Sequence, residues 1–474
     1  MTDLAVSAEA LNRQFEYITE VRRLLQDRFG DVPPKAFTHT YGCQGNVADG
    51  ERIDGLLEQM GYEFTNDPSE ADFILFNTCA VREHAEERVY GNVGRLKKFK
   101  ETNPNLVIAL CGCMVQQEHV AKRLKSHFPY VDLVFGTHVQ YRVPELLWNV
   151  LSTGERVFDI TEDDNDIAEG LAPRRHHPFK AFLPISYGCN NFCTFCVVPH
   201  VRGRERSRKY EDILANARQL VADGYREIML LGQNVNSYGR DLYGKPRFAD
   251  VLEAVADTGI ERIRFATSHP KDLTDEVIGK FATLPNLMPA LHLPAQSGSD
   301  AILKAMHRVY TVDHYLGLID KLRDACPGIA LSTDIIVGFP GETEEDFQGT
   351  YDLVKRVGYS QVFTFIYSKR EGTPAAKLVD DTPRSVIQER FERLRAVVED
   401  GALAYNKASL GKVVPVLFEG PSKKEPGIAT GHSPENINVH AIVPEGCSID
   451  ELVGQTHDVL IDEARTWYLR GRLA

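Results

Sequence analysis

The chain has 474 residues, of which 43% are hydrophobic and 26% are charged, and its formal net charge is −13. This composition predicts a globular protein of about three domains and excludes a simple basic nucleic-acid-binding protein, although a local basic patch could still contact phosphates. We find no signal-peptide pattern and no run of about 18 uncharged apolar residues, so we expect a cytoplasmic protein without a membrane span. In that compartment, clustered cysteines are more often metal ligands or reactive groups than disulfides.

The first part of the chain predicts a helical extension followed by a parallel α/β domain. Residues 1–34 carry apolar residues at helical spacing and predict a packing or accessory helix. From 35 to 158, short apolar strands such as "DFILFNTC" and "NLVIALCGC" alternate with amphipathic helices, which indicates a parallel sheet. Residues 159–180 are polar, charged and proline-bearing, as expected of a linker.

The rest of the chain predicts two further domains. Between 181 and 409, strands and helices alternate six times and a long helix follows, which indicates an open or partial (β/α)6 barrel with its site at the C-terminal strand ends. From 410 to 474, short strands separated by Gly and Pro turns predict a small all-β sandwich or barrel. The expected fold class is therefore α/β with a small C-terminal β domain.

The stretch "SYGCNNFCTFC" places Cys189, Cys193 and Cys196 on one loop, directly after the first strand of the predicted barrel. Structural zinc sites usually take four protein ligands, and only His200 follows at close spacing. A 4Fe-4S cluster also normally takes four ligands, so three thiolates leave one iron without a protein ligand. That open iron could bind a substrate or a cofactor.

A second group of cysteines follows three strands of the first domain: Cys43 in "TYGCQGN", Cys79 in "FNTCAVRE" and Cys113 in "ALCGCMVQ". Because parallel strands end at the same edge of a sheet, the three thiols could converge there and hold a second cluster with an open iron. The alternative is a set of separate core or surface cysteines. Cys111 is interpreted as a buried strand thiol, with replacement of Cys113 as a ligand left open.

Taken together, "YGCQGN", "FNTCAVRE", "GCM", "SYGCNNFCTFC", "RGRERSR", "LLGQNVNSYG" and "TDIIVGFPGETEEDF" resemble the methylthiotransferases of the radical S-adenosylmethionine (SAM) superfamily. The resemblance covers about residues 36–474. It implies two 4Fe-4S clusters, SAM cleaved at the Cys189/Cys193/Cys196 cluster to a 5′-deoxyadenosyl radical, and a C-terminal TRAM-like barrel that binds RNA. The chain departs from the family's usual residues at Gly45, His200 and Lys369, none of which is a cluster ligand.

The same resemblance suggests which residues contact SAM at the strand ends of the barrel. The candidates are Gly232, Gln233, Gln296, Ser297, Arg308 and Asp334. Arg308 is expected to pair with the SAM carboxylate, and Asp334 to lie near the adenine. His269 is either a further site residue or a hydrogen-bonded loop histidine.

Within the family, "VVPHVRGRERSR" and "LLGQNVNSYG" resemble the branch that methylthiolates carbon 2 of the isopentenylated adenosine beside the tRNA anticodon. A ribosomal-protein aspartate or a threonylcarbamoyl-adenosine remains an alternative substrate. An iron–sulfur electron carrier, or an RNA-binding module with structural clusters, remains an alternative class of protein. The expected partners are tRNA and a reductant protein such as flavodoxin or ferredoxin. The candidate RNA-contact residues are Arg202, Arg204, Arg206, Arg208, Lys423 and Lys424.

Overall fold

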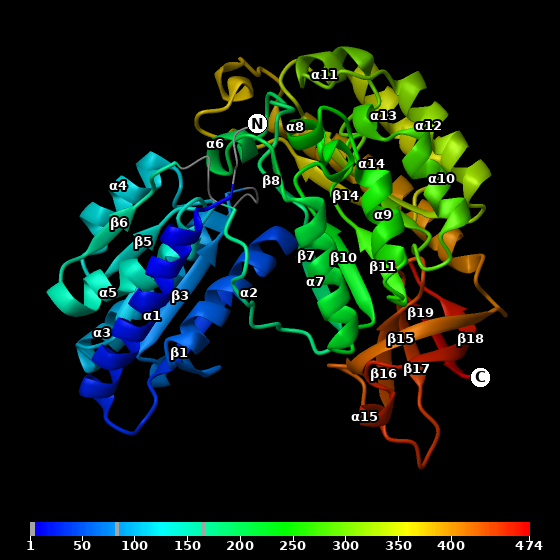
Figure 1. The fold of residues 1–474 in the computed structure, drawn as a ribbon. Coiled ribbons are helices and arrows are strands. Elements are labelled where there is room, and N and C mark those ends of the chain that lie inside the picture. The colour runs from blue at the N-terminus through cyan, green and yellow to red at the C-terminus, as the bar shows by residue number, and fades with distance from the viewer. Residues whose placement is uncertain (1–4, 81–84, 163–166) are drawn as a thin grey trace.

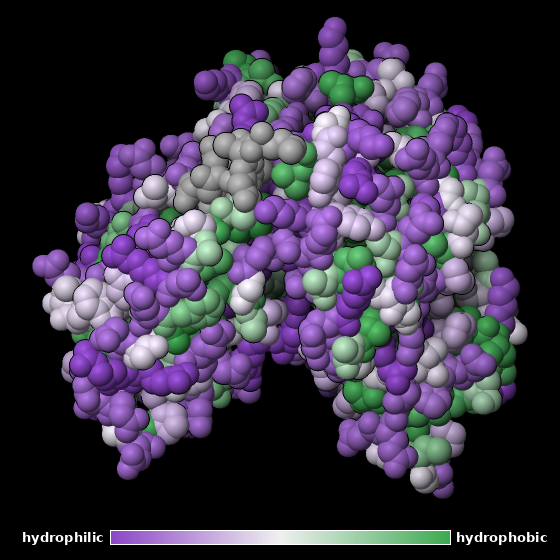
Figure 2. Space-filling view, viewed as in Figure 1, coloured by the Kyte–Doolittle hydropathy of each residue, from purple (hydrophilic) through white to green (hydrophobic). Residues whose placement is uncertain are grey.

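The computed structural model describes residues 5–80, 85–162 and 167–474, which form two lobes with a third, smaller domain below the second lobe (Figure 1). In Figure 2 a notch separates the two lobes at the lower edge of the molecule. Residues of the linker and of the segment 216–225 line a cavity of about 610 Å³, with Arg174 and Tyr225 among them.

The N-terminal lobe is a six-stranded, wholly parallel sheet in the order β2-β1-β3-β4-β5-β6, as expected. Helices α1, α2 and α5 cover one face and α3 and α4 cover the other, and β3 and β4 are buried along their whole length. The elements are α1 (Ala8–Phe29), β1 (Lys35–Thr40), α2 (Gln44–Gln59), β2 (Glu63–Phe64), β3 (Phe73–Thr78), α3 (Ala85–Thr102), β4 (Val107–Gly112), α4 (Glu118–His127), β5 (Leu133–Phe135), α5 (Val143–Thr153) and β6 (Val157–Asp159).

The N-terminal extension is a packing helix, as its apolar pattern predicts. The ring of Tyr17 in α1 lies 5.5 Å from that of Trp148 in α5, and the buried Gln14 side chain donates a hydrogen bond to Glu145. The apolar stripe of α1 therefore belongs to the core of the first lobe.

The central domain is a partial barrel of six parallel strands in two three-stranded ladders, β7-β10-β11 and β12-β13-β14, which a bridge between Ile263 and Leu287 joins. Its helices pack on the outer face of the strands around one large apolar core. The elements are β7 (Lys180–Pro184), β8 (Ser186–Tyr187), α6 (Val198–Val201), β9 (Arg206–Ser207), α7 (Tyr210–Ala222), β10 (Glu227–Leu231), α8 (Arg240–Tyr243), α9 (Phe248–Ala256), β11 (Arg262–Phe265), α10 (Asp275–Thr283), β12 (Ala290–His292), α11 (Asp300–Ala305), α12 (Val312–Ala325), β13 (Ala330–Val337), α13 (Glu344–Val357), β14 (Gln361–Ile366) and α14 (Arg384–Lys407).

The C-terminal domain is a closed five-stranded barrel in the order β15-β16-β17-β19-β18, so of the two architectures expected it is the barrel. Two buried arginines of β11 fasten it to the central domain: Arg262 donates to the carbonyl of His432, and Arg264 to those of Ser433 and Pro434. The elements are β15 (Val413–Pro421), β16 (Ile428–His432), β17 (Asn438–Ile442), α15 (Ile449–Leu452), β18 (Thr456–Ala464) and β19 (Leu469–Leu473).

The segment between the first two domains is tied to helix α2 by charge. Arg175 forms a 2.8 Å ion pair with the buried Glu51, and His176 lies 2.6 Å from the buried Asp54. These contacts hold α2 against the central domain, where it lies beside β7.

Candidate active site

The loop that carries Cys189, Cys193 and Cys196 leaves the barrel after β7 and β8. It is a tight loop: a Cβ atom at Gly188, whose φ is +72°, would lie 2.0 Å from the carbonyl oxygen of Arg204, so only glycine fits there. The Cys189 N–H donates to the carbonyl of Gly203 and the Cys196 N–H to that of Cys193. The backbone thus fixes the thiols at the C-terminal end of the barrel strands, where barrel active sites lie.

The three thiols lie close enough to interact. Burial raises the pKa of Cys189 to about 11 and that of Cys196 to about 12, and Cys193 contributes to both shifts. Without metal, such thiols keep their protons near neutral pH, and metal binding releases those protons. Among the described residues, no group of three or more Cys, His, Asp or Glu converges on a single ion. A cluster takes each cysteine on a separate iron, so the all-thiol donor set fits an iron–sulfur cluster.

Arg308 contacts this triad through Cys193, a contact that the sequence did not predict. Its guanidinium is buried and donates to Cys193 Sγ at 3.4 Å, to the carbonyl of Pro294 at 2.9 Å and to the Tyr310 hydroxyl at 2.9 Å. A guanidinium has five N–H donors, so these contacts leave one donor on each terminal nitrogen. Arg308 therefore orients a cysteine, and its pairing with the SAM carboxylate stays a prediction.

A cavity of about 560 Å³ opens beside Cys196 in the barrel. Gln296 and Asp334, both predicted as cofactor contacts, line it, and so does Phe365 of β14, which the sequence analysis missed. Phe363 and Phe365 are 42% and 48% exposed, although they are large apolar side chains on a barrel strand. The alternating aromatics of "QVFTFI" were the available signal.

Ser297 does not line that cavity. It is buried, its hydroxyl lies 3.3 Å from the Thr350 hydroxyl, and it accepts a hydrogen bond from the Ser299 N–H. His269 is hydrogen-bonded within its loop, because its Nδ1 accepts from the Lys271 N–H. Its role as a further site residue stays a prediction. Burial, together with Arg308 and Lys271, lowers the pKa of His269 to about 2, so its ring is neutral.

The loop after β10 supports a ligand site at the barrel mouth. A Cβ at Gly232 would lie 2.5 Å from Ser186 Oγ, so the close approach of the two strands requires glycine. Among the described residues, several buried polar atoms here lack a hydrogen-bond partner: Ser186 Oγ, Gln233 Oε1, Asn234 Oδ1, Asn236 Nδ2, Ser268 Oγ and Tyr367 OH. Unpartnered buried polar atoms are costly, and their gathering at one end of the barrel fits a polar ligand such as SAM.

The second cysteine group lies at one edge of the N-terminal sheet. Cys113 and Cys43 each place their Sγ 3.7 Å from Asn46 Oδ1. A Cβ at Gly42 would lie 2.9 Å from Cys79 Sγ. Burial raises the pKa of Cys113 to about 12, and Cys79 and Cys43 add to the rise while Arg202 opposes it. The three thiols are thus neighbours, and as an all-thiol set they fit a second cluster.

Cys111 faces the other side of the sheet. It is fully buried in β4 and packs into the core under α2 and α5, as expected of a strand thiol. Cys113, by contrast, packs with Ala80, Val197 and Val201, the last two from the central domain. The cysteine that faces the central domain is therefore Cys113.

Burial limits which residues of the arginine run could contact RNA, and three of the predicted ones are wrong for this structure. Arg202, Arg206 and Arg208 are buried, at 6%, 3% and 3% exposure, and cannot reach an RNA phosphate in this structure. Arg208 pairs with Glu169 of the linker, and Arg206 donates to the carbonyls of Arg202 and Arg204. Arg204 is exposed and lies over the Phe192 ring at 4.3 Å.

The two lysines predicted to contact RNA lie on the surface of the C-terminal domain. Lys423 and Lys424 are both exposed in the turn between β15 and β16. With Arg204, they are the candidates of that set whose side chains solvent can reach.

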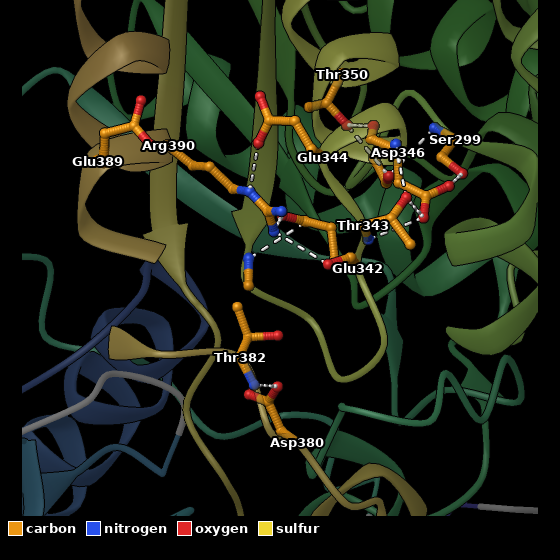
Figure 3. Close-up of polar contacts among 12 residues, drawn as sticks. Ser299, Glu342, Thr343, Glu344, Asp346, Thr350, Asp380, Thr382, Glu389 and Arg390 are labelled. Atoms are coloured by element: carbon orange, nitrogen blue, oxygen red, sulfur yellow. Dashed lines mark hydrogen bonds and ion pairs between the residues drawn. The ribbon is translucent and has the colours of Figure 1, made fainter. Parts of the chain in front are cut away.

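A buried ion cluster supports the loop after β13. Figure 3 shows Arg390 of α14 pointing toward Glu342 and Glu344. Glu342 also accepts the Gly338 N–H at 3.2 Å, which fixes the turn that follows β13. Burial raises the pKa of Glu342 to about 7, although Gly338 and Arg390 act in the opposite direction. No local pattern marks Arg390 in the sequence, because its partners are distant along the chain.

Within residues 5–80, 85–162 and 167–474, every helix is too short or too polar to span a lipid bilayer.

Comparison with known proteins agrees with this architecture. Residues 35–136 match the uncharacterized protein family UPF0004, residues 183–354 the radical SAM superfamily, and residues 407–474 the TRAM domain. Among solved structures, the radical SAM methyltransferase TsrM of Kitasatospora setae aligns with a TM-score of 0.52 over 73% of this chain and 74% of that one. At 12% identity, this likeness shows the fold alone.

Curated relatives match from end to end. A tRNA-2-methylthio-N(6)-dimethylallyladenosine synthase of a Thermoanaerobacter species is 47% identical over 100% of this chain and 98% of its own length. Proteins of the same name from Clostridium botulinum and Caldicellulosiruptor saccharolyticus are 48% and 47% identical over 96% and 97% of this chain. The chain belongs to the tRNA-2-methylthio-N(6)-dimethylallyladenosine synthase family of radical SAM methylthiotransferases.

Proposed function

We propose that this protein attaches a methylthio group to carbon 2 of N(6)-dimethylallyladenosine in tRNA. The observation that carries the proposal is the 47% identity to synthases of that activity over the whole chain, with none of the three domains left out. The family uses SAM and a 4Fe-4S cluster, for which the Cys189, Cys193 and Cys196 thiols provide three ligands.

In the barrel, the residues of this chain hold and orient the reactants. SAM bound at the Cys189, Cys193 and Cys196 cluster would supply the radical chemistry that activates carbon 2. Gln296, Asp334 and Phe365 line the cavity beside Cys196, so they can contact SAM and the adenine that enters it. The aromatic face of Phe365 suits a nucleobase, because aromatic side chains stack on bases.

A second cluster, held by Cys43, Cys79 and Cys113, is proposed as the place where the transferred sulfur is held. Its support is the proximity of the three thiols and their position facing the central domain. Gln233 of the barrel lies next to this site: its Nε2 is 3.9 Å from where a Cβ of Gly45 would be. The loop after β10 is therefore next to the second cysteine group.

The remaining partners follow from the chemistry. A reductant protein such as flavodoxin or ferredoxin would supply the electron, and the reaction would take place in the cytoplasm with the tRNA pool. We assign tRNA backbone contacts to the exposed Arg204, Lys423 and Lys424, because phosphate contacts require accessible positive charge.

The test is an anaerobic reaction of the reconstituted protein with SAM, a reductant, and tRNA that carries N(6)-dimethylallyladenosine. Mass spectrometry of the digested tRNA should show the 2-methylthio derivative, and 5′-deoxyadenosine should accumulate. tRNA with threonylcarbamoyl-adenosine and the ribosomal-protein aspartate substrate run in parallel. A methylthio product on either of these two substrates, with none on the N(6)-dimethylallyladenosine tRNA, would overturn the proposal. Absence of 5′-deoxyadenosine would favour the alternative that the protein is an electron carrier.

A further inference from the structure

Each cysteine group has one buried arginine in contact with one of its thiols. Arg308 lies 3.4 Å from Cys193 and belongs to the same domain as that cysteine. Arg202 lies 3.1 Å from Cys113 through its Nε, but it comes from the central domain while Cys113 belongs to the N-terminal one. Arg202, which contacts the second cysteine group, thus comes shortly after Cys196 of the first group in the sequence.

The surroundings of Arg202 form a closed polar network. Its Nη2 donates to Asn46 Oδ1 at 3.0 Å and to Asp49 Oδ2 at 2.7 Å, and Arg202 and Asp49 are 6% and 4% exposed. Asn46 is held in turn, since its Nδ2 donates to the carbonyls of Tyr41 and Thr78. A buried guanidinium is costly unless it is paired, so the charge of Arg202 is held in this one place.

The contact also lies at the center of the interdomain packing. Val197 and Val201 pack against Ala80 and Cys113, and the Thr137 hydroxyl donates to the carbonyl of Val201. The segment that carries Arg202 therefore keeps the same position relative to Cys113 whenever the two lobes are docked.

We propose that Arg202 is a positioning residue for the second cluster: its charge and its Nε–Sγ contact raise the midpoint potential of the cluster at Cys43, Cys79 and Cys113, and Asp49 opposes it. The inference rests on the proposed second cluster. Reduction adds one negative charge to a cluster, and net charge and hydrogen bonds to the sulfurs set its potential. A cation at Cys113 favours the reduced form, and a carboxylate on that cation weakens the effect.

The test uses the full chain with Cys189, Cys193 and Cys196 changed to Ala, reconstituted anaerobically and titrated with reductant while electron paramagnetic resonance follows the cluster. Arg202→Gln should lower the midpoint potential and Asp49→Asn should raise it. The potential of Arg202→Lys should lie between those of Arg202→Gln and the parent. Arg204→Gln, an exposed neighbour, should leave the potential unchanged. A merely structural role would move both network variants in the same direction.

Opposite shifts at equal iron content support the inference, and shifts of the same sign, or none, overturn it. If Arg202→Gln does not bind iron, the midpoint potential of Asp49→Asn is the test. If that potential does not rise above the parent's, the inference is overturned. If the parent itself binds no iron, the second cluster and this role of Arg202 both fall. The tRNA product test is independent of that outcome, so the two failures are distinguishable.

Discussion

At the scale of single residues, Phe365 offers the sharpest test of the substrate cavity. Its ring is 48% exposed on β14 and lines the cavity beside Cys196. Stacking of a base on an aromatic side chain contributes about 1–3 kcal/mol. We therefore expect Phe365→Ala to lower kcat/KM for the modified tRNA by about tenfold. Steady-state kinetics with mass-spectrometric product detection would measure it.

The matched control for Phe365 is Phe15, a similarly exposed aromatic side chain on α1. Phe15→Ala should leave kcat/KM unchanged. Helix α1 packs on α5 in the N-terminal lobe, and Phe15 does not line the cavity in the barrel. An equal loss in both variants, or no loss in Phe365→Ala, would show that the ring does not contact the substrate.

The two cysteine groups should separate by function as well as by place. Cys189→Ala should abolish formation of 5′-deoxyadenosine, whereas Cys79→Ala should preserve it and yield no methylthio product. Two 4Fe-4S clusters correspond to about eight irons per chain, and either change should leave about four. Cys447 is an exposed cysteine in the C-terminal domain, so Cys447→Ala should change neither the iron content nor the formation of 5′-deoxyadenosine and product. Full product formation by Cys79→Ala would contradict the assignment of the second cluster.

At the scale of elements, the sequence predicts what local pattern determines. The apolar runs of β3 and β4 identify buried strands, and the spacing of Cys189, Cys193 and Cys196 identifies their loop. The arginine run between Arg202 and Arg208 shows the limit of prediction from local pattern. A charged loop is usually solvated, yet Arg202 and Arg208 are buried because Asp49 and Glu169, distant in sequence, lie opposite them. Such pairing depends on domain docking, which no local pattern encodes.

The loop after β13 gives a prediction about an element. Arg390→Met would leave Glu342 buried without its guanidinium partner, although the Gly338 N–H would remain. Breaking a buried pair from one side costs about 3–5 kcal/mol. We expect urea unfolding, followed by circular dichroism, to report a loss of about 3 kcal/mol.

Arg393, one turn further along α14, is the control for Arg390. It pairs with Glu344 and Glu389 at the surface, with its side chain 36% exposed. Exposed ion pairs contribute at most about 1 kcal/mol, so Arg393→Met should have a much smaller effect. Equal losses in the two variants would mean that burial of the Arg390–Glu342 pair is not what matters.

At the scale of the whole molecule, charged side chains make many of the contacts between domains, and this explains why sequence reasoning found the domains but not their arrangement. The predicted linker reads as a solvated segment, yet Arg175 and His176 bind Glu51 and Asp54 of α2. The C-terminal barrel is held by Arg262 and by the chain carbonyls it meets. Polar residues at such joints have no periodicity that separates them from surface residues.

One of these joints gives a pH prediction. Glu419 of β15 lies between Lys180 of β7 and His432 of β16. Burial alone would raise the pKa of Glu419, but His432 and Lys180 lower it to about 2, from an ordinary value of 4.5. Because the folded pKa is depressed, the ionised carboxylate stabilises the folded protein fully above pH 4.5, through His432 within the barrel and through Lys180 across the joint. This contribution is lost as the pH falls from 4.5 toward 2.

Glu419→Gln should therefore destabilise the joint at pH 7 and have progressively less effect as the pH falls through that window. Limited proteolysis between α14 and β15, compared for the two proteins at pH 7, 4.5 and 3, would measure the difference. Since other carboxylates also protonate in acid, the decisive quantity is the gap between variant and parent rather than either rate alone. A gap that stays constant from pH 7 to 3 would show that ionised Glu419 does not hold the C-terminal barrel to the central domain.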